Sequence, residues 1–246
     1  MTIMKPSKPT AISFFAGAGG MDAGFGLAGF DVRLAIEIDP SCCDTLRHNL
    51  KHTKVVSRDI NQVSSEEICE LSRLKVGEID CVFGGPPCQS FSLAGKREGL
   101  NDERGLLVFR FIELVRELRP KTFVIENVKG MVNWQGGIVL HEVERMLGEA
   151  LSTGEYYQVQ HRVLNAADYG VPQNRQRVFI VGSRINASYK FPEPTHAAKP
   201  ERFDNKLKPY VTVGDALHGI PKADAPSKTA LRVSQTIKGR IEKHGY

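Results

Sequence analysis

Short apolar runs alternate with amphipathic helical patterns over the first 185 residues. The runs at 11–15, 32–36, 80–83, 122–125 and 178–181 have the length of buried strands, and residues 55–56 are a further strand candidate. Between the runs, apolar residues recur every three or four positions and predict two helices with one apolar face each: Leu107, Phe111, Leu114 and Leu118, then Val139, Val143, Met146 and Ala150. This alternation predicts βαβ units, which build a mostly parallel α/β sheet covered by helices on both faces.

The chain carries no signal for membrane insertion or export. No apolar run reaches the roughly 18 residues of a membrane span. The first ten residues, MTIMKPSKPT, lack the apolar core of a signal peptide. We therefore expect a cytoplasmic protein without a membrane-bound segment.

The net charge of +5 is concentrated near the C-terminus. Residues 199–246 hold 10 Lys and Arg against 5 Asp and Glu, which accounts for the whole excess, so the preceding residues are neutral in sum. A neutral body with a basic end suits contact with a polyanion such as nucleic acid. A solvated basic terminus explains the same pattern.

A glycine-rich turn, Phe15-Ala16-Gly17-Ala18-Gly19-Gly20, follows the first apolar run. Glycines allow the tight turn and the close approach to a ligand that occur at the carboxyl ends of strands. Glu37 lies twenty residues after Gly17, where a carboxylate can accept hydrogen bonds from ribose hydroxyls. The third glycine comes too early for the dinucleotide pattern, which favours a nucleoside cofactor without a pyrophosphate. An ordinary strand-to-helix turn explains the glycines as well.

Asp59 and Ile60 follow the candidate strand at 55–56. At the end of a strand, the Asp59 carboxylate is placed to accept a hydrogen bond from an adenine amino group. The same residue type also caps helix N-termini, and the two interpretations are equally good at this stage.

The five cysteines are spaced irregularly and form no zinc-binding pattern, so we expect no bound metal. Most of them fit the role of a small apolar side chain. Cys88 does not, because it follows the turn Gly84-Gly85-Pro86-Pro87 and precedes polar residues. The prolines fix the backbone φ angle, so this turn would hold a thiol rigidly at the end of a strand. The pattern therefore predicts Cys88 as a nucleophile.

Two further polar segments lie at strand ends. Glu126 and Asn127 end the run 122–125, so in a parallel sheet they lie on the same rim as Cys88, where a carboxyl group can act as a general acid or bind a ring nitrogen. Arg175 and Arg177 precede the run 178–181. Alternation along an extended segment would place these arginines on opposite faces, as surface charges. At the start of a strand, both would instead bend toward the rim.

Taken in order, these segments resemble the cytosine-C5 DNA methyltransferase family. The resemblance runs from about Ile12 to about Leu217. It rests on the glycine turn 15–20, Glu37-Ile38-Asp39, Asp59-Ile60, Pro86-Pro87-Cys88-Gln89-Ser90-Phe91-Ser92, Arg104-Gly105-Leu106-Leu107, Glu126-Asn127-Val128, Gln173-Asn174-Arg175-Gln176-Arg177 and the segment 191–196. Ser13 and Phe14 depart from it, since the family more often has Asp and Leu there.

The resemblance implies a class I, Rossmann-like methyltransferase that transfers a methyl group from S-adenosylmethionine to C5 of a cytosine flipped out of duplex DNA. Cys88 would add covalently to C6 of the base, assisted by Glu126, Arg175 and Arg177. The cofactor pocket would be formed by Phe15, Gly17, Gly19, Gly20, Glu37, Asp59, Ile60, Pro87 and Leu107. The substrate would be bound or positioned by Pro86, Gln89, Ser92 and Asn127.

Family members continue with a target-recognition domain and a closing segment that packs on the cofactor pocket, and neither pattern occurs before Tyr246. We expect residues 1–190 to form the catalytic, cofactor-binding domain and residues 191–246 to form a linker toward a recognition domain that is absent from this chain. A split enzyme with a second subunit, a truncated product and a non-catalytic binder are three explanations. The break at a domain boundary, with every catalytic motif present, favours the split enzyme, which would suit a restriction–modification system.

Two other functions compete with DNA methylation. An RNA (tRNA) cytosine-C5 methyltransferase would carry the same motifs, and a nucleic-acid-binding remnant would keep the fold without the chemistry. The presence of Cys88, Glu126, Arg175 and Arg177 argues against the remnant. A dehydrogenase is a poorer interpretation, because the Pro-Pro-Cys turn has no role in one.

Overall fold

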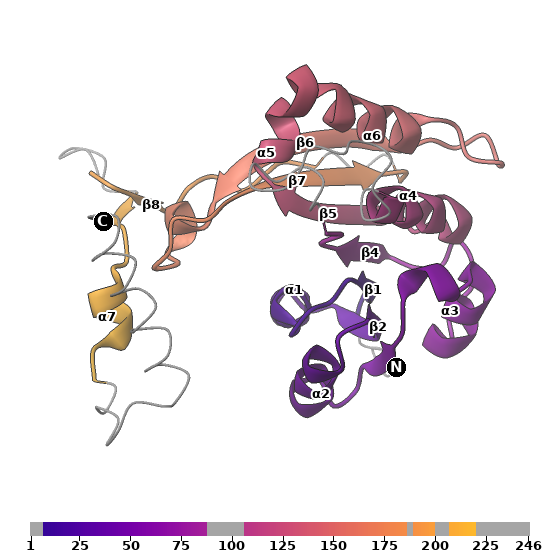
Figure 1. Cartoon of the computed structure of the whole chain (residues 1–246), viewed down its shortest axis with the longest axis horizontal. Coiled ribbons are helices and arrows are strands. Elements are labelled where there is room, and N and C mark those ends of the chain that lie inside the picture. The colour runs from indigo at the N-terminus through magenta and orange to yellow at the C-terminus, as the bar shows by residue number, and fades with distance from the viewer. Residues whose placement is uncertain (1–6, 88–105, 186–188, 200–206, 220–246) are drawn as a thin grey trace, which may run out of the picture.

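A seven-stranded sheet forms the centre of the protein in the computed structural model, which describes residues 7–87, 106–185, 189–199 and 207–219 (Figure 1). The strand order is β3-β2-β1-β4-β5-β7-β6. The strands are β1 (Thr10–Phe14), β2 (Asp31–Glu37), β3 (Lys54–Ser57), β4 (Cys81–Gly84), β5 (Thr122–Val128), β6 (Gln158–Asn165) and β7 (Gln176–Ser183).

The first five strands are parallel, and only β7 runs antiparallel to its neighbours β5 and β6. The chain moves from β1 to β2 and β3 in one direction, and then from β4 to β5 in the other. The strand order therefore reverses between β1 and β4, and ligands of such sheets bind outside the carboxyl ends at this point. Because β7 is antiparallel, its amino end lies on the same rim.

Helices cover both faces of the sheet, as the sequence predicts (Figure 1). Right-handed crossovers place α1 and α2 on one face and, after the strand order reverses, place α3, α4 and α6 on the other. The helices are α1 (Gly20–Leu27), α2 (Pro40–Asn49), α3 (Ser65–Ser72), α4 (Leu106–Leu118), α5 (Gly130–Asn133) and α6 (Ile138–Gly148), with short 3-10 turns η1 (Ile60–Gln62), η4 (Trp134–Gly137) and η5 (Ala166–Tyr169).

The larger core lies between the sheet and the layer of α3, α4 and α6. Phe14 of β1 and Phe111 of α4 meet edge to face there, with their ring centroids 5.6 Å apart. The predicted apolar face of α4 is buried at Phe111, Leu114 and Leu118 and partly buried at Leu107.

The predicted face of α6 is wrong at its last position. Val139 and Val143 are buried, but the helix ends at Gly148 because Glu149 takes an extended backbone conformation. Ala150 therefore lies beyond the helix and is exposed. Leu147 fills the corresponding place in the core.

The strand β6 has no counterpart in the sequence prediction. It is an edge strand whose first residues are mostly exposed and polar, including Gln158, Gln160 and Arg162. Apolar alternation, the signal that locates half-buried strands, is therefore weak there. Pairing with β7 along its whole length defines the strand instead.

Beyond β7 the chain forms only short elements within the described residues: β8 (His196–Ala197), β9 (Lys208–Pro209) and α7 (Val213–Leu217). No helix among the described residues has the length and apolar character needed to cross a membrane. The boundary near residue 190 remains a prediction.

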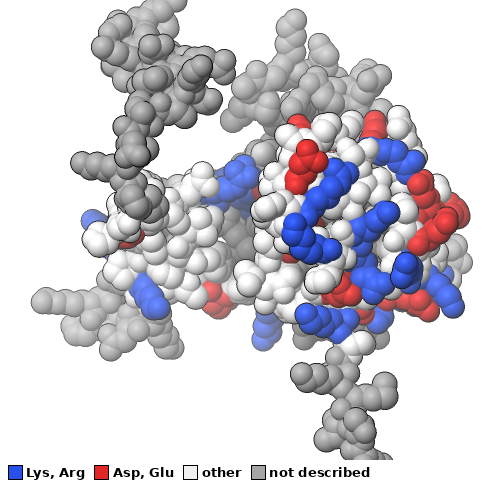
Figure 2. Space-filling view, turned by 90° about the horizontal axis from the view of Figure 1, so that it is seen from below, with Lys and Arg blue, Asp and Glu red and all other residues white. Residues whose placement is uncertain are grey.

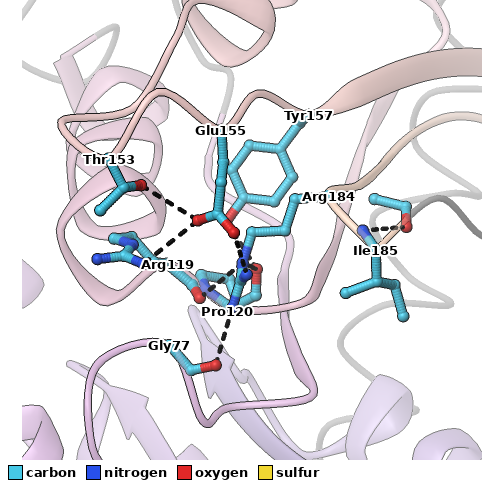
Figure 3. A network of polar contacts seen from close by, with 9 residues as sticks. Gly77, Arg119, Pro120, Thr153, Glu155, Tyr157, Arg184 and Ile185 are labelled. Atoms are coloured by element: carbon cyan, nitrogen blue, oxygen red, sulfur yellow. Dashed lines mark hydrogen bonds and ion pairs between the residues drawn. The ribbon is translucent and has the colours of Figure 1, made fainter.

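Arg184, which directly follows β7, binds backbone carbonyls at the edge of the sheet opposite the glycine turn (Figure 3). Its guanidinium donates to the carbonyls of Arg119, Pro120 and Gly77 at 3.1, 3.0 and 2.8 Å and pairs with Glu155 at 3.2 Å. The side chain is 10% exposed. One side chain thus joins the segments that precede β4 and β5 to the end of β7.

Candidate active site

The glycine turn at the end of β1 has left-handed backbone at three positions: Phe15 (φ 53°), Gly17 (φ 54°) and Gly19 (φ 89°). The positive φ at position 19 favours glycine, and a Cβ atom there would in addition lie 2.8 Å from the Leu46 side chain. Phe15 adopts this conformation although it is not a glycine. Such a conformation costs energy, and strained residues of this kind cluster at active sites and ligand sites.

Glu37, at the end of β2, holds this turn. Its Oε2 accepts a hydrogen bond from the Gly17 amide at 2.7 Å, and its Oε1 accepts from the amides of Ile38 and Asp39, each at 2.9 Å. Three backbone donors therefore fix the carboxylate in one orientation. A carboxylate held this way keeps lone pairs for a further donor such as a hydroxyl group.

A cavity of about 410 Å³ lies beside Glu37, and we call it the carboxylate cavity. Six of the nine predicted cofactor residues line it: Phe15, Glu37, Asp59, Ile60, Pro87 and Leu107. Gly17 and Gly19 do not line it. They belong to the turn beside it, and the Gly17 amide binds Glu37, which does line it. Gly20 lines a neighbouring cavity instead.

Sequence reasoning assigned no role to Ile38, Arg58 and Asn61, which also line the carboxylate cavity. Ile38 is 64% exposed although it is apolar, and it directly follows Glu37. An apolar residue directly after the carboxylate that was predicted to bind ribose was the available signal. Asp59 caps the 3-10 turn η1, since its Oδ1 accepts from the Asn61 amide at 2.9 Å, so the capping interpretation holds for that oxygen.

A second cavity, of about 550 Å³, lies at the ends of β1, β4, β5 and β7, and we call it the rim cavity. Glu126 lies in its wall. Arg177 Nε lies 2.9 Å from Glu126 Oε1, and Arg175 lies 3.8 Å from the same oxygen. Both arginines therefore bend toward the rim, as one of the two alternatives predicts, because the antiparallel β7 begins at this rim. The expectation of opposite faces is wrong, since residues two apart on an extended segment lie on the same face.

The turn after β4 passes close to both β1 and Glu126. A Cβ atom on Gly84 would lie 2.1 Å from the Phe14 carbonyl oxygen, and a Cβ atom on Gly85 would lie 3.2 Å from Glu126 Oε2. Any side chain at position 84 would collide with the neighbouring strand. Glycine at both positions lets the turn approach the carboxylate.

Asn127 links this turn to β5. It is 3% exposed, and its Nδ2 donates to the Pro86 carbonyl at 3.2 Å while its Oδ1 accepts from the Val128 amide at 2.8 Å. The side-chain amide thus joins the residues before Cys88 to the strand that carries Glu126. Phe15 and Gly85 line both cavities, so the two cavities adjoin.

The family described as C-5 cytosine-specific DNA methylase matches residues 10–243. The chain belongs to this family. The family and the Rossmann-like sheet predicted from the motifs are thereby confirmed. Membership implies S-adenosylmethionine as the methyl donor.

Known relatives of this methylase agree with that assignment. The Type II methyltransferase M.AquIA of Picosynechococcus is 53% identical over 243 residues, covering 96% of this chain and 98% of that relative. M.XorII of Xanthomonas oryzae is 41% identical, covering 89% of this chain and 48% of that relative. A solved structure described as a prophage-encoded DNA modification methyltransferase of E. coli has a TM-score of 0.68 and 30% identity, covering 87% of this chain and 56% of that one.

The methylase therefore spans nearly all of one relative and about half of the others. Seven curated Type II methyltransferases, 35 to 41% identical to it, are covered over 48 to 63% of their length. The remainder of those relatives has no counterpart in residues 1–246.

Cys88, Gln89 and Ser92 lie outside the described residues. Two of the cysteines that the structure does describe have unreactive thiols. Burial in β4 raises the pKa of the Cys81 thiol to about 12, and burial together with the Glu66 charge raises the pKa of the Cys69 thiol. Neither would be a thiolate nucleophile near neutral pH.

Proposed function

We propose that this methylase transfers a methyl group from S-adenosylmethionine to C5 of cytosine in duplex DNA, with Cys88 as the nucleophile. One observation carries the proposal: the Glu126 carboxylate, held by Arg177 and Arg175, adjoins the turn that directly precedes Cys88. A carboxylate held beside a cysteine-bearing turn, next to a cofactor-sized cavity, is an arrangement suited to attack on a base.

The carboxylate cavity fits the adenosine part of the cofactor. Glu37 offers oxygen acceptors for ribose hydroxyls, and Asp59 offers one for the adenine amino group. Phe15, Ile60 and Leu107 offer apolar walls for a flat base. When bound, S-adenosylmethionine supplies an electrophilic methyl group on its sulfonium, which the C5 atom of the base takes up.

The residues of the chain activate the base for that transfer. The Cys88 thiolate forms a bond to C6, and the C5–C6 π electrons become available at C5 as an enamine. Both arginines lie against Glu126 Oε1, whereas Oε2 faces the turn before Cys88. Oε2 would share a proton with N3 as charge develops there. After C5 is methylated, a base or water removes the C5 proton. The electrons of that C–H bond re-form the C5–C6 double bond, and the thiolate leaves C6.

Three further groups would orient the cytosine. The Pro86 carbonyl, which already accepts from Asn127, has a second lone pair for the exocyclic amine and would favour cytosine over uracil. Arg177 would bind the O2 edge. Arg175, more exposed and farther from Glu126, would bind a phosphate and lower the pKa of Cys88.

We also propose that a second polypeptide supplies target recognition, with residues 191–246 as the linker toward it. Two facts support this. In seven relatives, 37 to 52% of the length lies outside the matched region. M.AquIA, in contrast, matches over 98% of its length, so a relative of this span exists. The polypeptide encoded by the neighbouring reading frame is the first candidate.

The test is covalent trapping on DNA in which 5-fluorocytosine replaces cytosine. Fluorine at C5 blocks the final elimination, so a protein that attacks C6 stays bound to DNA through its thiol. We expect a denaturation-resistant complex when the chain, the neighbouring-frame polypeptide, S-adenosylmethionine and DNA are combined. Cys88→Ser should abolish the complex, and the matched variant Cys42→Ser should retain it.

Each other outcome has a distinct meaning. Trapping by the chain alone would refute the need for a second polypeptide and leave the chemistry intact. Trapping on 5-fluorocytosine tRNA but not on DNA would make the substrate RNA. No trapping on either nucleic acid, with the neighbouring-frame polypeptide bound, would refute the methyltransferase proposal and favour a non-catalytic binder.

A further inference from the structure

The 3-10 turn η1 and its cap residue line the carboxylate cavity, although the turn itself is very short. Asp59, Ile60 and Asn61 all line that cavity. A turn of this length makes few hydrogen bonds of its own, and its last carbonyl groups find no partner inside it. Its start is fixed by the Asp59 cap on the Asn61 amide. Its other end depends on contacts with other elements.

Arg110 of α4 holds that other end. Its Nη2 donates to the carbonyl of Val63, the residue that ends η1, at 2.9 Å. The two residues are 47 positions apart in the chain, so the bond joins separate elements. The Arg110 side chain is 19% exposed, and Val63 is buried. A carbonyl in such a place loses a partner that water does not readily replace when the donor is removed.

The bond to Val63 distinguishes Arg110 from ordinary charged residues of the surface. On the face shown in Figure 2, basic and acidic side chains are intermingled over the described part of the body. Exposed pairs of opposite charge contribute little to stability. The contact of Arg110 Nη1 with Glu113 at 3.2 Å is a pair of this kind, since the Glu113 side chain is 57% exposed. The bond to the backbone of η1 is therefore the contact of Arg110 that matters.

The first turn of α4 forms another wall of the carboxylate cavity. Leu107 lines the cavity and precedes Arg110 by three residues, which places both on the same side of the helix. Ile60 and Val63 are buried in the larger core, where η1 packs against α4. Arg110 thus joins two elements that each supply an apolar wall to the cavity.

We propose that Arg110 is a positioning residue for the cofactor, which holds η1 against α4 and so fixes the part of the cavity that Ile60 and Leu107 line. This inference rests on the proposed function, in which the adenine ring lies between such apolar walls. Without the guanidinium, the Val63 carbonyl loses its donor, and η1 loses the polar contact that ties it to α4. Asp59 and Ile60 would then be held less firmly, and the cofactor would bind more weakly while the fold persists.

Arg116 provides the matched control on the same helix. Its guanidinium donates to the carbonyls of Met146, Glu149 and Ala150 at 2.9, 3.2 and 3.0 Å. These bonds join α4 to the end of α6, and none of these residues lines the carboxylate cavity. Loss of the Arg116 guanidinium should therefore lower the stability of the protein at least as much as loss of the Arg110 guanidinium, without changing the affinity for the cofactor.

The test measures the affinity for S-adenosylhomocysteine, which shares the adenosine part of the cofactor, by isothermal titration calorimetry. Arg110→Met and Arg116→Met keep an apolar stem and remove the donors. We expect Arg110→Met to raise the Kd at least about tenfold, as for a lost hydrogen bond to a charged group, and Arg116→Met to leave it unchanged. Arg110→Lys keeps a cationic donor and should give an intermediate Kd. Thermal denaturation defines a temperature at which every variant is folded.

The outcomes separate this inference from the proposed function. If the unaltered chain, alone or with the neighbouring-frame polypeptide, binds no S-adenosylhomocysteine, the cofactor assignment of the proposed function fails and the inference fails with it. If the unaltered chain and Arg110→Met bind with the same Kd, the inference is wrong and the cofactor assignment stands. If Arg116→Met raises the Kd as much as Arg110→Met does, the weaker binding reflects a general loss of rigidity, and the inference is overturned.

Discussion

Replacing Asn127 by alanine tests whether one buried side chain positions the nucleophile. The change removes the hydrogen bond from Nδ2 to the Pro86 carbonyl, which joins β5 to the turn before Cys88. It also removes the acceptor that Val128 uses. Asn127 is 3% exposed, so water does not readily replace these partners.

The magnitude follows from the groups left unpaired. A buried acceptor without a donor costs about 1–3 kcal/mol. If that cost appears in the transition state for attack, the rate falls by roughly 5- to 150-fold, at 1.36 kcal/mol for each factor of ten. We expect slower covalent trapping on 5-fluorocytosine DNA under single-turnover conditions, with cofactor affinity largely retained because the Glu37 carboxylate is untouched.

The exposed residue Asn49, at the end of α2, provides the matched control, and Asn49→Ala should trap DNA at the wild-type rate. Urea denaturation of each variant separates rate from stability. A trapping rate for Asn127→Ala equal to that of the wild type would refute the reasoning. A loss of stability alone would make Asn127 a structural residue only.

Two further predictions concern stability. Arg184→Ala removes the donor to three carbonyls and the partner of the half-exposed Glu155, so it should lower the free energy of unfolding by about 1–3 kcal/mol. Replacing the exposed Arg145 by alanine should lower the free energy of unfolding by about 1 kcal/mol or less. Urea denaturation measures both variants. Burial raises the pKa of Asp22 from 3.8 to about 6. The stability that this shift provides is complete below pH 3.8 and is lost as the pH rises through 6, amounting to about 3 kcal/mol. Asp22→Asn should therefore flatten the unfolding free energy between pH 4 and 6, and an unchanged slope would contradict the shift.

Most of the parallel half of the sheet is readable from the sequence, because β1, β2, β4 and β5 have no exposed residue on either face. Continuous apolar runs mark β1, β2, β4 and β5, and their carboxyl ends place the glycine turn, Glu37 and Glu126 on one rim. The edge strand β6 follows from pairing with β7 rather than from its own pattern, so it escapes such reasoning.

The arginines show a similar limit within the site. The period of two places Arg175 and Arg177 on the same face of an extended segment, but only the antiparallel entry of β7 at the rim brings both to Glu126. That geometry depends on tertiary structure. Likewise, Ile38 lines the carboxylate cavity because β2 ends there, and its place in the Glu37-Ile38-Asp39 motif alone did not assign it a role.

Phe15 and Gly85 line both cavities, and one has a left-handed backbone conformation while the other has no side chain. Under the proposed function, the backbone at these two residues would set the separation between methyl donor and acceptor base. Cofactor and base would be brought to reacting distance by the folded backbone itself. With recognition on the proposed second polypeptide, selection for a new target sequence would act on that polypeptide and leave the backbone between the two cavities unchanged.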